Sequence, residues 1–130
     1  MSARVLIVED EESILLSLEF LLKKEGHAVI TARDGAAALQ ALQANVPDLI
    51  LLDVMLPLVD GFELCRLIRE MPALHNTRIM LVTARGREAE IARGLALGAD
   101  AYMTKPFSTR ELMDNVRRLL SGNTASIKAD

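Results

Sequence analysis

Side chains suited to phosphoryl chemistry stand at the ends of four short apolar segments of the sequence. They are Glu9 and Asp10, Asp53, Thr83, and Lys105. Three carboxylates brought to one point would repel one another and raise at least one pKa unless a cation lay among them. A hard divalent cation that accepts oxygen ligands and keeps several waters suits such a group. This predicts Mg2+, with Mn2+ as the alternative.

A carboxylate, a hydroxyl, an ammonium group and Mg2+ together make a phosphoryl-transfer site, where catalysis is mostly positioning and charge neutralisation. An aspartate can act as the nucleophile in such a site and form an aspartyl phosphate. Asp53 is the best placed, because it is central, with the other acids and Lys105 on either side. No cluster of Cys and His suits zinc, and neither His27 nor His75 is expected nearby. We therefore predict Asp53 as a phosphoacceptor.

The segment around Asp53 predicts how this side chain is held. The apolar run Leu49–Leu52 is too short for a helix and ends on the carboxylate, as in a central parallel strand covered on both faces. Pro57 and Asp60-Gly61 then require a loop. Asp53 is therefore expected at the carboxyl end of a buried strand, where open α/β sheets bind their ligands.

Short apolar runs and helical spacing alternate along the rest of the chain. Strands are predicted at residues 4–8, 28–32, 49–52, 79–82 and 99–103, each followed by a helix. The run 28–32 is the least apolar and is expected near a sheet edge. Gly26 and Gly98 are predicted helix caps, and Ser108 to Glu111 is a capping box. Five alternations of strand and helix predict an α/β fold, with helices on both faces of a parallel sheet. The carboxyl ends of its strands then lie on one edge.

Composition limits what the chain could be. Its 130 residues are 51% hydrophobic and 25% charged, which predicts one folded domain over residues 1–120 and a polar tail or truncated linker at 121–130. The net charge of −3, without a dense Lys/Arg run, argues against direct nucleic acid binding by this segment. The chain shows no run of membrane-spanning length and no signal peptide, and the single Cys65 permits no internal disulfide. No membrane association and a cytoplasmic location are therefore predicted.

In this order and at these intervals, the motifs resemble those of the receiver domain of two-component response regulators, over residues 4–120. Val8-Glu9-Asp10-Glu11 is similar to the acidic pair that binds Mg2+ directly or through water, with Glu9 replacing the commoner Asp. Leu51-Leu52-Asp53-Val54-Met55-Leu56-Pro57 is similar to the phosphoacceptor motif. The resemblance implies that Asp53 accepts the phosphoryl group and that the Met55 backbone carbonyl is a further metal ligand.

The remaining motifs resemble the switch of this family. Thr83-Ala84 is similar to the switch hydroxyl and its small neighbour, and Tyr102 to the switch aromatic. Lys105-Pro106-Phe107 is similar to the family's lysine, which a cis peptide usually follows. Two positions depart from the usual pattern: Leu58-Val59 is more apolar than the usual loop, and Ala101 stands where an acidic residue is frequent.

The resemblance implies a doubly wound (βα)5 fold with the flavodoxin-like strand order 2-1-3-4-5. It also implies a signalling switch rather than an enzyme, one that catalyses only its own phosphorylation and dephosphorylation. A sensor histidine kinase or a phosphotransfer protein would phosphorylate Asp53. The population would then shift towards an active conformer that regulates an effector domain or a downstream protein.

The output surface is predicted on three elements, namely the helix Arg85–Leu97, the strand Ala99–Met103 and the helix Ser108–Leu120. Charged residues there, Asp100 and Arg117 among them, could form the self-complementary pairs that a two-fold interface needs. Exposed ion pairs contribute little. The expectation is therefore at most a weak homodimer that phosphorylation enhances, with a different partner protein as the alternative.

Three other functions fit the pattern less well. A haloacid-dehalogenase-like phosphatase would need a second acid two residues after the nucleophile, where Met55 stands, and a cap domain for its substrate. A flavodoxin-like cofactor binder would need a phosphate-cradling loop where Glu9 to Glu12 would repel phosphate. A receiver fold that regulates without phosphorylation is disfavoured because every site residue is present.

Overall fold

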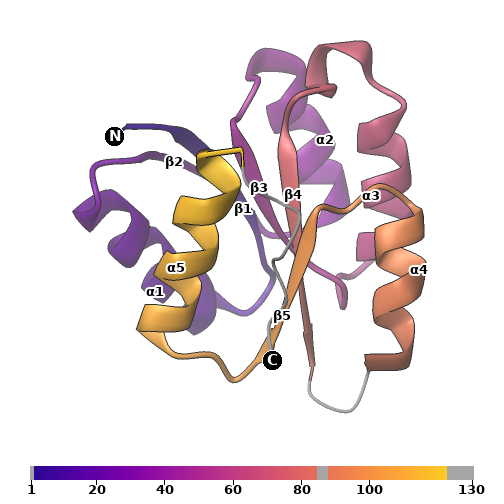
Figure 1. Ribbon diagram of the computed structural model, residues 1–130. Coiled ribbons are helices and arrows are strands. Elements are labelled where there is room, and N and C mark those ends of the chain that lie inside the picture. Colours follow the sequence, from indigo (N-terminus) through magenta and orange to yellow (C-terminus); the bar gives the residue numbers. More distant parts are fainter. Residues whose placement is uncertain (1, 85–87, 123–130) are drawn as a thin grey trace.

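A five-stranded parallel sheet forms the centre of the computed structural model, which describes residues 2–84 and 88–122. Its strands are β1 (Arg4–Val8), β2 (Ala28–Ala32), β3 (Leu49–Asp53), β4 (Arg78–Ala84) and β5 (Ala101–Lys105). They lie in the order β2-β1-β3-β4-β5 (Figure 1). The predicted α/β class and the predicted strand order are both confirmed. The predicted tail at 121–130 lies, from residue 123 onward, outside the described residues.

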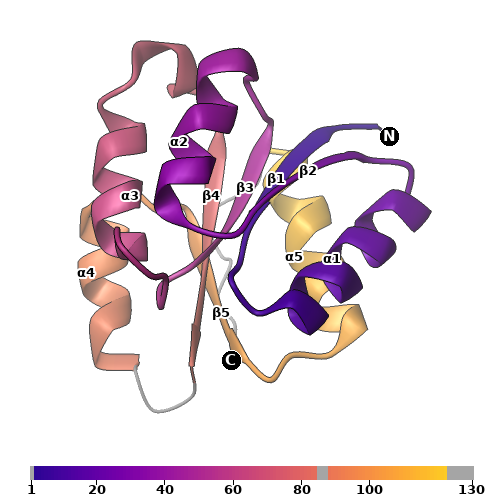
Figure 2. The same ribbon diagram turned by 180° about the vertical axis from the view of Figure 1, so that it is seen from behind.

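Helices cover both faces of the sheet (Figures 1 and 2). One face carries α1 (Glu12–Lys24) and α5 (Thr109–Leu120), and the other carries α2 (Gly35–Ala44), α3 (Gly61–Arg69) and α4 (Ile91–Ala96). Short 3-10 turns, η1 (Pro72–Leu74) and η2 (Glu88–Glu90), precede β4 and α4. None of the helices within the described ranges is long and apolar enough to cross a membrane.

The central strand β3 contributes side chains to the hydrophobic core on both faces of the sheet. Successive side chains of a strand point to opposite faces, so Leu49 and Leu51 pack with α1 and α5 while Ile50 and Leu52 pack with α2 and α3. Every residue of β3 is buried, whereas in β2 Ala32 is buried and the other four residues are exposed or partly exposed; β2 lies at the sheet edge, as predicted. This double coverage explains why β3 reads as an unbroken apolar run.

Several predicted helix ends are confirmed. Gly26 and Gly98 follow α1 and α4 with φ angles of 94° and 112°, in the left-handed region that favours glycine. The Ser108 hydroxyl accepts the Glu111 backbone N–H at 3.0 Å and begins α5. These signals depend on neighbours in the sequence, which is why the sequence alone places them well.

The helix and strand predicted after β4 differ from the described elements. Residues 85–87 of the helix predicted at 85–97 lie outside the described residues, and the rest consists of η2 followed by the six-residue α4 rather than one helix. β5 begins at Ala101 rather than at Ala99, because the Ala99 N–H bonds the Gly94 carbonyl at 3.1 Å and still caps α4. The Asp100 N–H then bonds the Ile79 carbonyl at 2.8 Å and leads the chain into the sheet.

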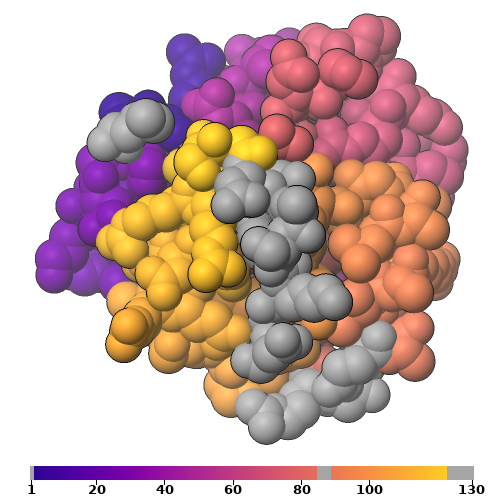
Figure 3. Space-filling model, viewed as in Figure 1, coloured from indigo at the N-terminus to yellow at the C-terminus, as the bar shows by residue number. Residues whose placement is uncertain are grey.

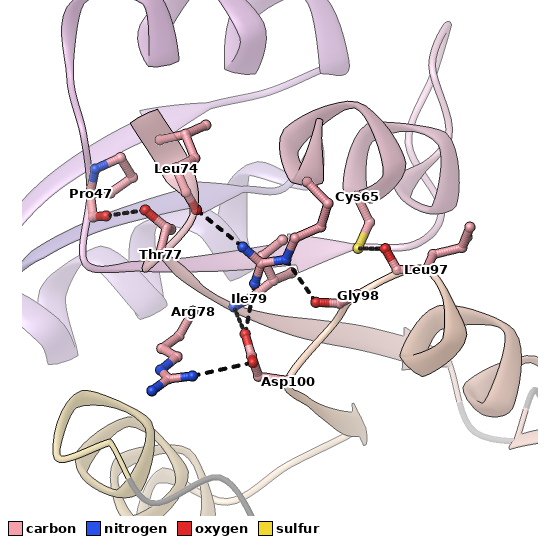
Figure 4. A network of polar contacts seen from close by, with 10 residues as sticks. Pro47, Cys65, Leu74, Thr77, Arg78, Ile79, Leu97, Gly98 and Asp100 are labelled. Carbon is pink, nitrogen blue, oxygen red and sulfur yellow. Dashed lines mark hydrogen bonds and ion pairs between the residues drawn. The ribbon is translucent and has the colours of Figure 1, made fainter. Parts of the chain in front are cut away.

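A polar network that sequence reasoning missed anchors the chain after α4 (Figure 4). Arg69 donates to the carbonyls of Gly98 at 2.8 Å and Leu74 at 3.2 Å. It also donates to Asp100 Oδ2 at 2.8 Å, an oxygen that accepts the Ile79 N–H as well. Ile79 is near the amino end of β4, whereas Asp53 is at the carboxyl end of β3. The network therefore lies at the opposite end of the strands from Asp53.

Candidate functional site

Asp53 is the last residue of β3, and its side chain is held from two directions. Its exposed fraction is 4%. Oδ1 accepts the Met55 N–H at 3.0 Å, and Oδ2 accepts a hydrogen bond from Lys105 Nζ at 3.1 Å. Gly61 packs against its backbone, since a Cβ on Gly61 would lie 2.5 Å from the Asp53 carbonyl oxygen. The loop after β3 and the end of β5 therefore both position this carboxylate.

The two acids that follow β1 lie beside Asp53, as predicted. One carboxylate oxygen from each of Glu9, Asp10 and Asp53 lies within 4.8 Å of the others. Glu9 is 2% exposed, and its Oε2 accepts the Glu11 N–H at 3.1 Å, whereas Asp10 is exposed. Oxygen ligands on opposite sides of Mg2+ lie about 4.2 Å apart. The spacing of the three acids thus fits a divalent cation, which they would hold either directly or through water.

Lys105 joins the buried acids from the other side. Its Nζ lies 3.0 Å from Glu9 Oε1 and 3.1 Å from Asp53 Oδ2. Burial acts to lower the pKa of Lys105, but the bonds and charges of these two carboxylates outweigh it, and the pKa is raised. Burial raises the pKa of Glu9 despite the lowering effect of Lys105. The expected cis peptide is present between Lys105 and Pro106.

Thr83 and Tyr102 meet at a small cavity beside this cluster. Thr83 is 3% exposed, and within residues 2–84 and 88–122 its Oγ1 has no hydrogen-bond partner. The cavity, about 10 Å3 in volume, is lined by both residues together with others from the loop after β3, α3, β4, η2 and α4, namely Val54, Phe62, Leu81, Glu90 and Ile91. Such a volume is at the lower limit for one water molecule. The structure therefore groups Thr83 with Tyr102 through a shared void.

Two features of the site extend what the sequence predicted. Met55 lies in the loop after β3 with 53% of its side chain exposed, and the role of its carbonyl as a metal ligand stays a prediction. Sequence reasoning missed Arg33, whose Nη2 donates to the Asp10 carbonyl at 3.0 Å. Arg33 directly follows β2, so the strand-end argument that identified the other residues could have found it.

Comparison with protein-family models identifies the family of this chain. The family model of the response regulator receiver domain matches residues 5–117. The chain belongs to this family. Response regulator receiver domains are signalling domains, and phosphorylation and magnesium are typical of them.

Curated relatives of this receiver domain are transcriptional regulators. The chain is 46% identical over 120 residues to the alkaline phosphatase synthesis transcriptional regulatory protein PhoP of Bacillus subtilis. It is 48% identical over 120 residues to the phosphate regulon transcriptional regulatory protein PhoB of Rhizobium meliloti. The matches cover 92% of this chain but 49% and 53% of those proteins, so the chain spans about half the length of the curated relatives.

A solved receiver domain shows the same fold. The receiver domain of the sensor histidine kinase PA1611 from Pseudomonas aeruginosa superposes with a TM-score of 0.84 at 28% identity. The alignment covers 93% of this chain and 99% of the other. That structure carries a magnesium ion coordinated in its active site cleft. The likeness extends over nearly the whole of both domains.

Proposed function

We propose that this receiver domain is a switch that a phosphoryl group on Asp53 activates. The donor is the phosphohistidine of a sensor histidine kinase or of a phosphotransfer protein. The observation that carries the proposal is the placement of the Asp53 carboxylate between two acids and the Lys105 ammonium. This is the charge arrangement that phosphoryl transfer to a carboxylate requires. The proposed switch occupies residues 1–120.

The transfer step follows from the groups around Asp53. One of its carboxylate oxygens forms the new P–O bond while the P–N bond of the phosphohistidine breaks, and the electron pair remains on the imidazole nitrogen. Lys105 already contacts Oδ2 at 3.1 Å and can donate to a phosphoryl oxygen next to it. Mg2+ held by Glu9, Asp10, Asp53 and the Met55 carbonyl would neutralise charge on the phosphoryl oxygens.

Thr83 and Tyr102 couple the phosphoryl group to a distant surface. A phosphoryl group adds strong acceptor oxygens. The Thr83 hydroxyl, which has no bonded partner in the described residues, turns to donate to one of them. The small cavity between the two side chains then enlarges towards Tyr102, and the phenol ring moves inward from β5. The population shifts towards a conformer with a changed β5 surface.

The proposed output surface consists of α4, β5 and α5, and Figure 3 shows the face on which α4 and α5 reach the surface. Its user is an effector domain or a separate downstream protein. Self-association through it is weak, because one charge on α5 and one just before β5 are already paired within the domain. Asp100 binds Arg69 at 2.8 Å, and Arg117 binds Glu25 at 3.0 Å.

Labelling by a small phosphodonor tests the proposal. Incubation with acetyl phosphate and Mg2+ should add one phosphoryl group to the intact mass of the wild type. The Asp53→Asn variant should gain none, and EDTA should abolish the reaction. The variant Asp114→Asn, which changes an exposed acid on α5, is the matched control and should label normally. Undiminished labelling of Asp53→Asn would overturn the assignment.

A further inference from the structure

Leu58 combines two unusual properties in the loop that follows β3. Its φ angle is 71°, in the left-handed region that residues other than glycine rarely adopt. The Val59 N–H bonds the Pro57 carbonyl at 2.8 Å and closes a three-residue turn around it, a turn that is rare and strained at this sign of φ. The side chain is also 86% exposed. Single exposed apolar side chains are common, but one on a strained backbone is a reason to look for a function.

The loop presents this side chain on a rigid support. The Gly61 N–H bonds the Val54 carbonyl at 2.9 Å and closes the loop at its base. Val59 packs so closely on the start of α2 that a Cβ on Gly35 would lie 2.7 Å from the Val59 Cβ. A fixed apolar group loses little conformational freedom when a partner covers it, and so it contributes more of its contact energy to binding.

Leu58 is also close to the phosphoacceptor. It lies three residues before Gly61, and consecutive Cα atoms are 3.8 Å apart, so the two Cα atoms are within about 11 Å of each other. Gly61 in turn packs on the Asp53 backbone. A protein interface of standard size covers about 800 Å2 of each partner, a disc of about 16 Å radius. An interface of this size over Asp53 is therefore large enough to include Leu58.

We propose that Leu58 is an apolar anchor for the protein that delivers the phosphoryl group to Asp53, and that it helps to decide which donor this domain accepts. The inference rests on the proposed function of Asp53. The occupant is an apolar patch on the donor beside its phosphohistidine. A small phosphodonor has no such patch, so Leu58 contributes to transfer from a protein and contributes nothing to transfer from acetyl phosphate.

Three variants separate the effect of the Leu58 side chain from the effect of the turn that holds it. Leu58→Asn removes the apolar group but keeps the turn, because asparagine tolerates the left-handed region. Leu58→Met keeps an apolar side chain of similar volume. Val46→Asn is the matched control, because Val46 is 50% exposed and stands before β3, at the opposite edge of the sheet. Urea unfolding of each variant shows that it is folded.

The experiment compares protein and small-molecule donors. Purified, autophosphorylated histidine kinases of the organism that encodes the chain are tested against the wild type, and the fastest is used for the variants. We expect kcat/KM for this kinase to fall about tenfold or more in Leu58→Asn. The rates of Leu58→Met and Val46→Asn should remain within about twofold of the wild type, as should the acetyl phosphate rate of every variant.

Each other outcome has a defined meaning. Equal loss with kinase and acetyl phosphate in Leu58→Asn would show that Leu58 acts through the loop and would overturn the anchor. An unchanged rate of transfer from the kinase to Leu58→Asn would also overturn the anchor. So would a wild type that acetyl phosphate labels but that no kinase phosphorylates. If acetyl phosphate fails to label wild-type Asp53, the proposed function itself fails, which is a different result.

Discussion

Lys105 Nζ lies 3.1 Å from Asp53 Oδ2, although 52 residues separate them in the chain and β4 lies between their strands. The same ammonium lies 3.0 Å from Glu9 Oε1 at the end of β1. One cation thus joins the ends of β1, β3 and β5 and offsets the repulsion between two buried carboxylates. The site and the stability of the sheet edge depend on the same bonds.

Replacing Lys105 by methionine should destabilise the domain because it leaves Glu9 and Asp53 buried without their cation. The free energy of unfolding should fall by about 2–4 kcal/mol in urea titrations with EDTA. Mg2+ should restore part of the loss, since the three acids fit a divalent cation. The control Lys24→Met changes an exposed lysine and should stay within about 0.5 kcal/mol of the wild type. Equal stability of the two variants would contradict the role assigned to Lys105.

Thr83→Val should separate stability from switching. The change removes a buried hydroxyl that lacks a partner in the described residues, so the free energy of unfolding should rise by about 1 kcal/mol. Acetyl phosphate should still label Asp53. Amide exchange in β5 and α4 should then respond to phosphorylation much less than in the wild type, because no hydroxyl moves out of the space that Tyr102 enters. A wild-type response in this variant would exclude the proposed coupling.

Gly61→Ala tests the contact beneath the phosphoacceptor. Its Cβ would lie 2.5 Å from the Asp53 carbonyl oxygen and 2.6 Å from the Val54 Cα, and backbone must move to admit it. We expect a loss of about 1–3 kcal/mol in the free energy of unfolding and slower labelling by acetyl phosphate. Gly26→Ala is the comparison: its added Cβ meets nothing within 4 Å, although its φ of 94° is strained. That variant should lose stability but label normally.

His27 should make stability depend on pH. Burial lowers its pKa, against the raising effect of Glu25, and its Nδ1 accepts the Ala3 N–H at 3.1 Å. The folded pKa therefore lies below the unfolded value of about 6.5. The stability that the neutral imidazole contributes is complete above about pH 6.5 and is lost as the pH falls from there through the folded pKa.

Urea unfolding between about pH 8 and pH 5 measures this effect. The wild type should lose more stability on acidification than His27→Gln. The variant His75→Gln changes an exposed histidine and should follow the wild type. Identical profiles for the wild type and His27→Gln would show that His27 does not carry the dependence.

Self-association should be weak and should depend on the phosphorylated state. Beryllofluoride mimics the phosphoryl group, and sedimentation velocity with and without it should show a shift towards dimers only at high protein concentration. The reason is that Asp100 and Arg117 are bound within the domain, and exposed ion pairs contribute about 1 kcal/mol or less each. If neither the sedimentation nor the amide exchange of α4, β5 and α5 changes while Asp53 is occupied, the output surface lies elsewhere.

The sequence by itself determined the features that depend on near neighbours. The alternation of five strands and helices, the glycine caps after α1 and α4 and the capping of α5 by Ser108 are all local signals. The strand-end argument also placed Glu9, Asp10, Asp53 and Lys105 at one edge, because parallel strands with right-handed crossovers bring their carboxyl ends together. The strand order came from the resemblance to receiver domains.

Tertiary structure alone decided what depends on contacts between distant segments. α4 packs so closely on β4 that a Cβ on Gly94 would overlap Leu81, and the Gly94 carbonyl holds Ala99 out of β5. Arg69 reaches Asp100 across 31 residues. The left-handed Leu58 and the unbonded Thr83 hydroxyl likewise follow from how loops pack on the completed sheet. Periodicity reports which face of an element is apolar, but not which atoms of another element will fill the space beside it.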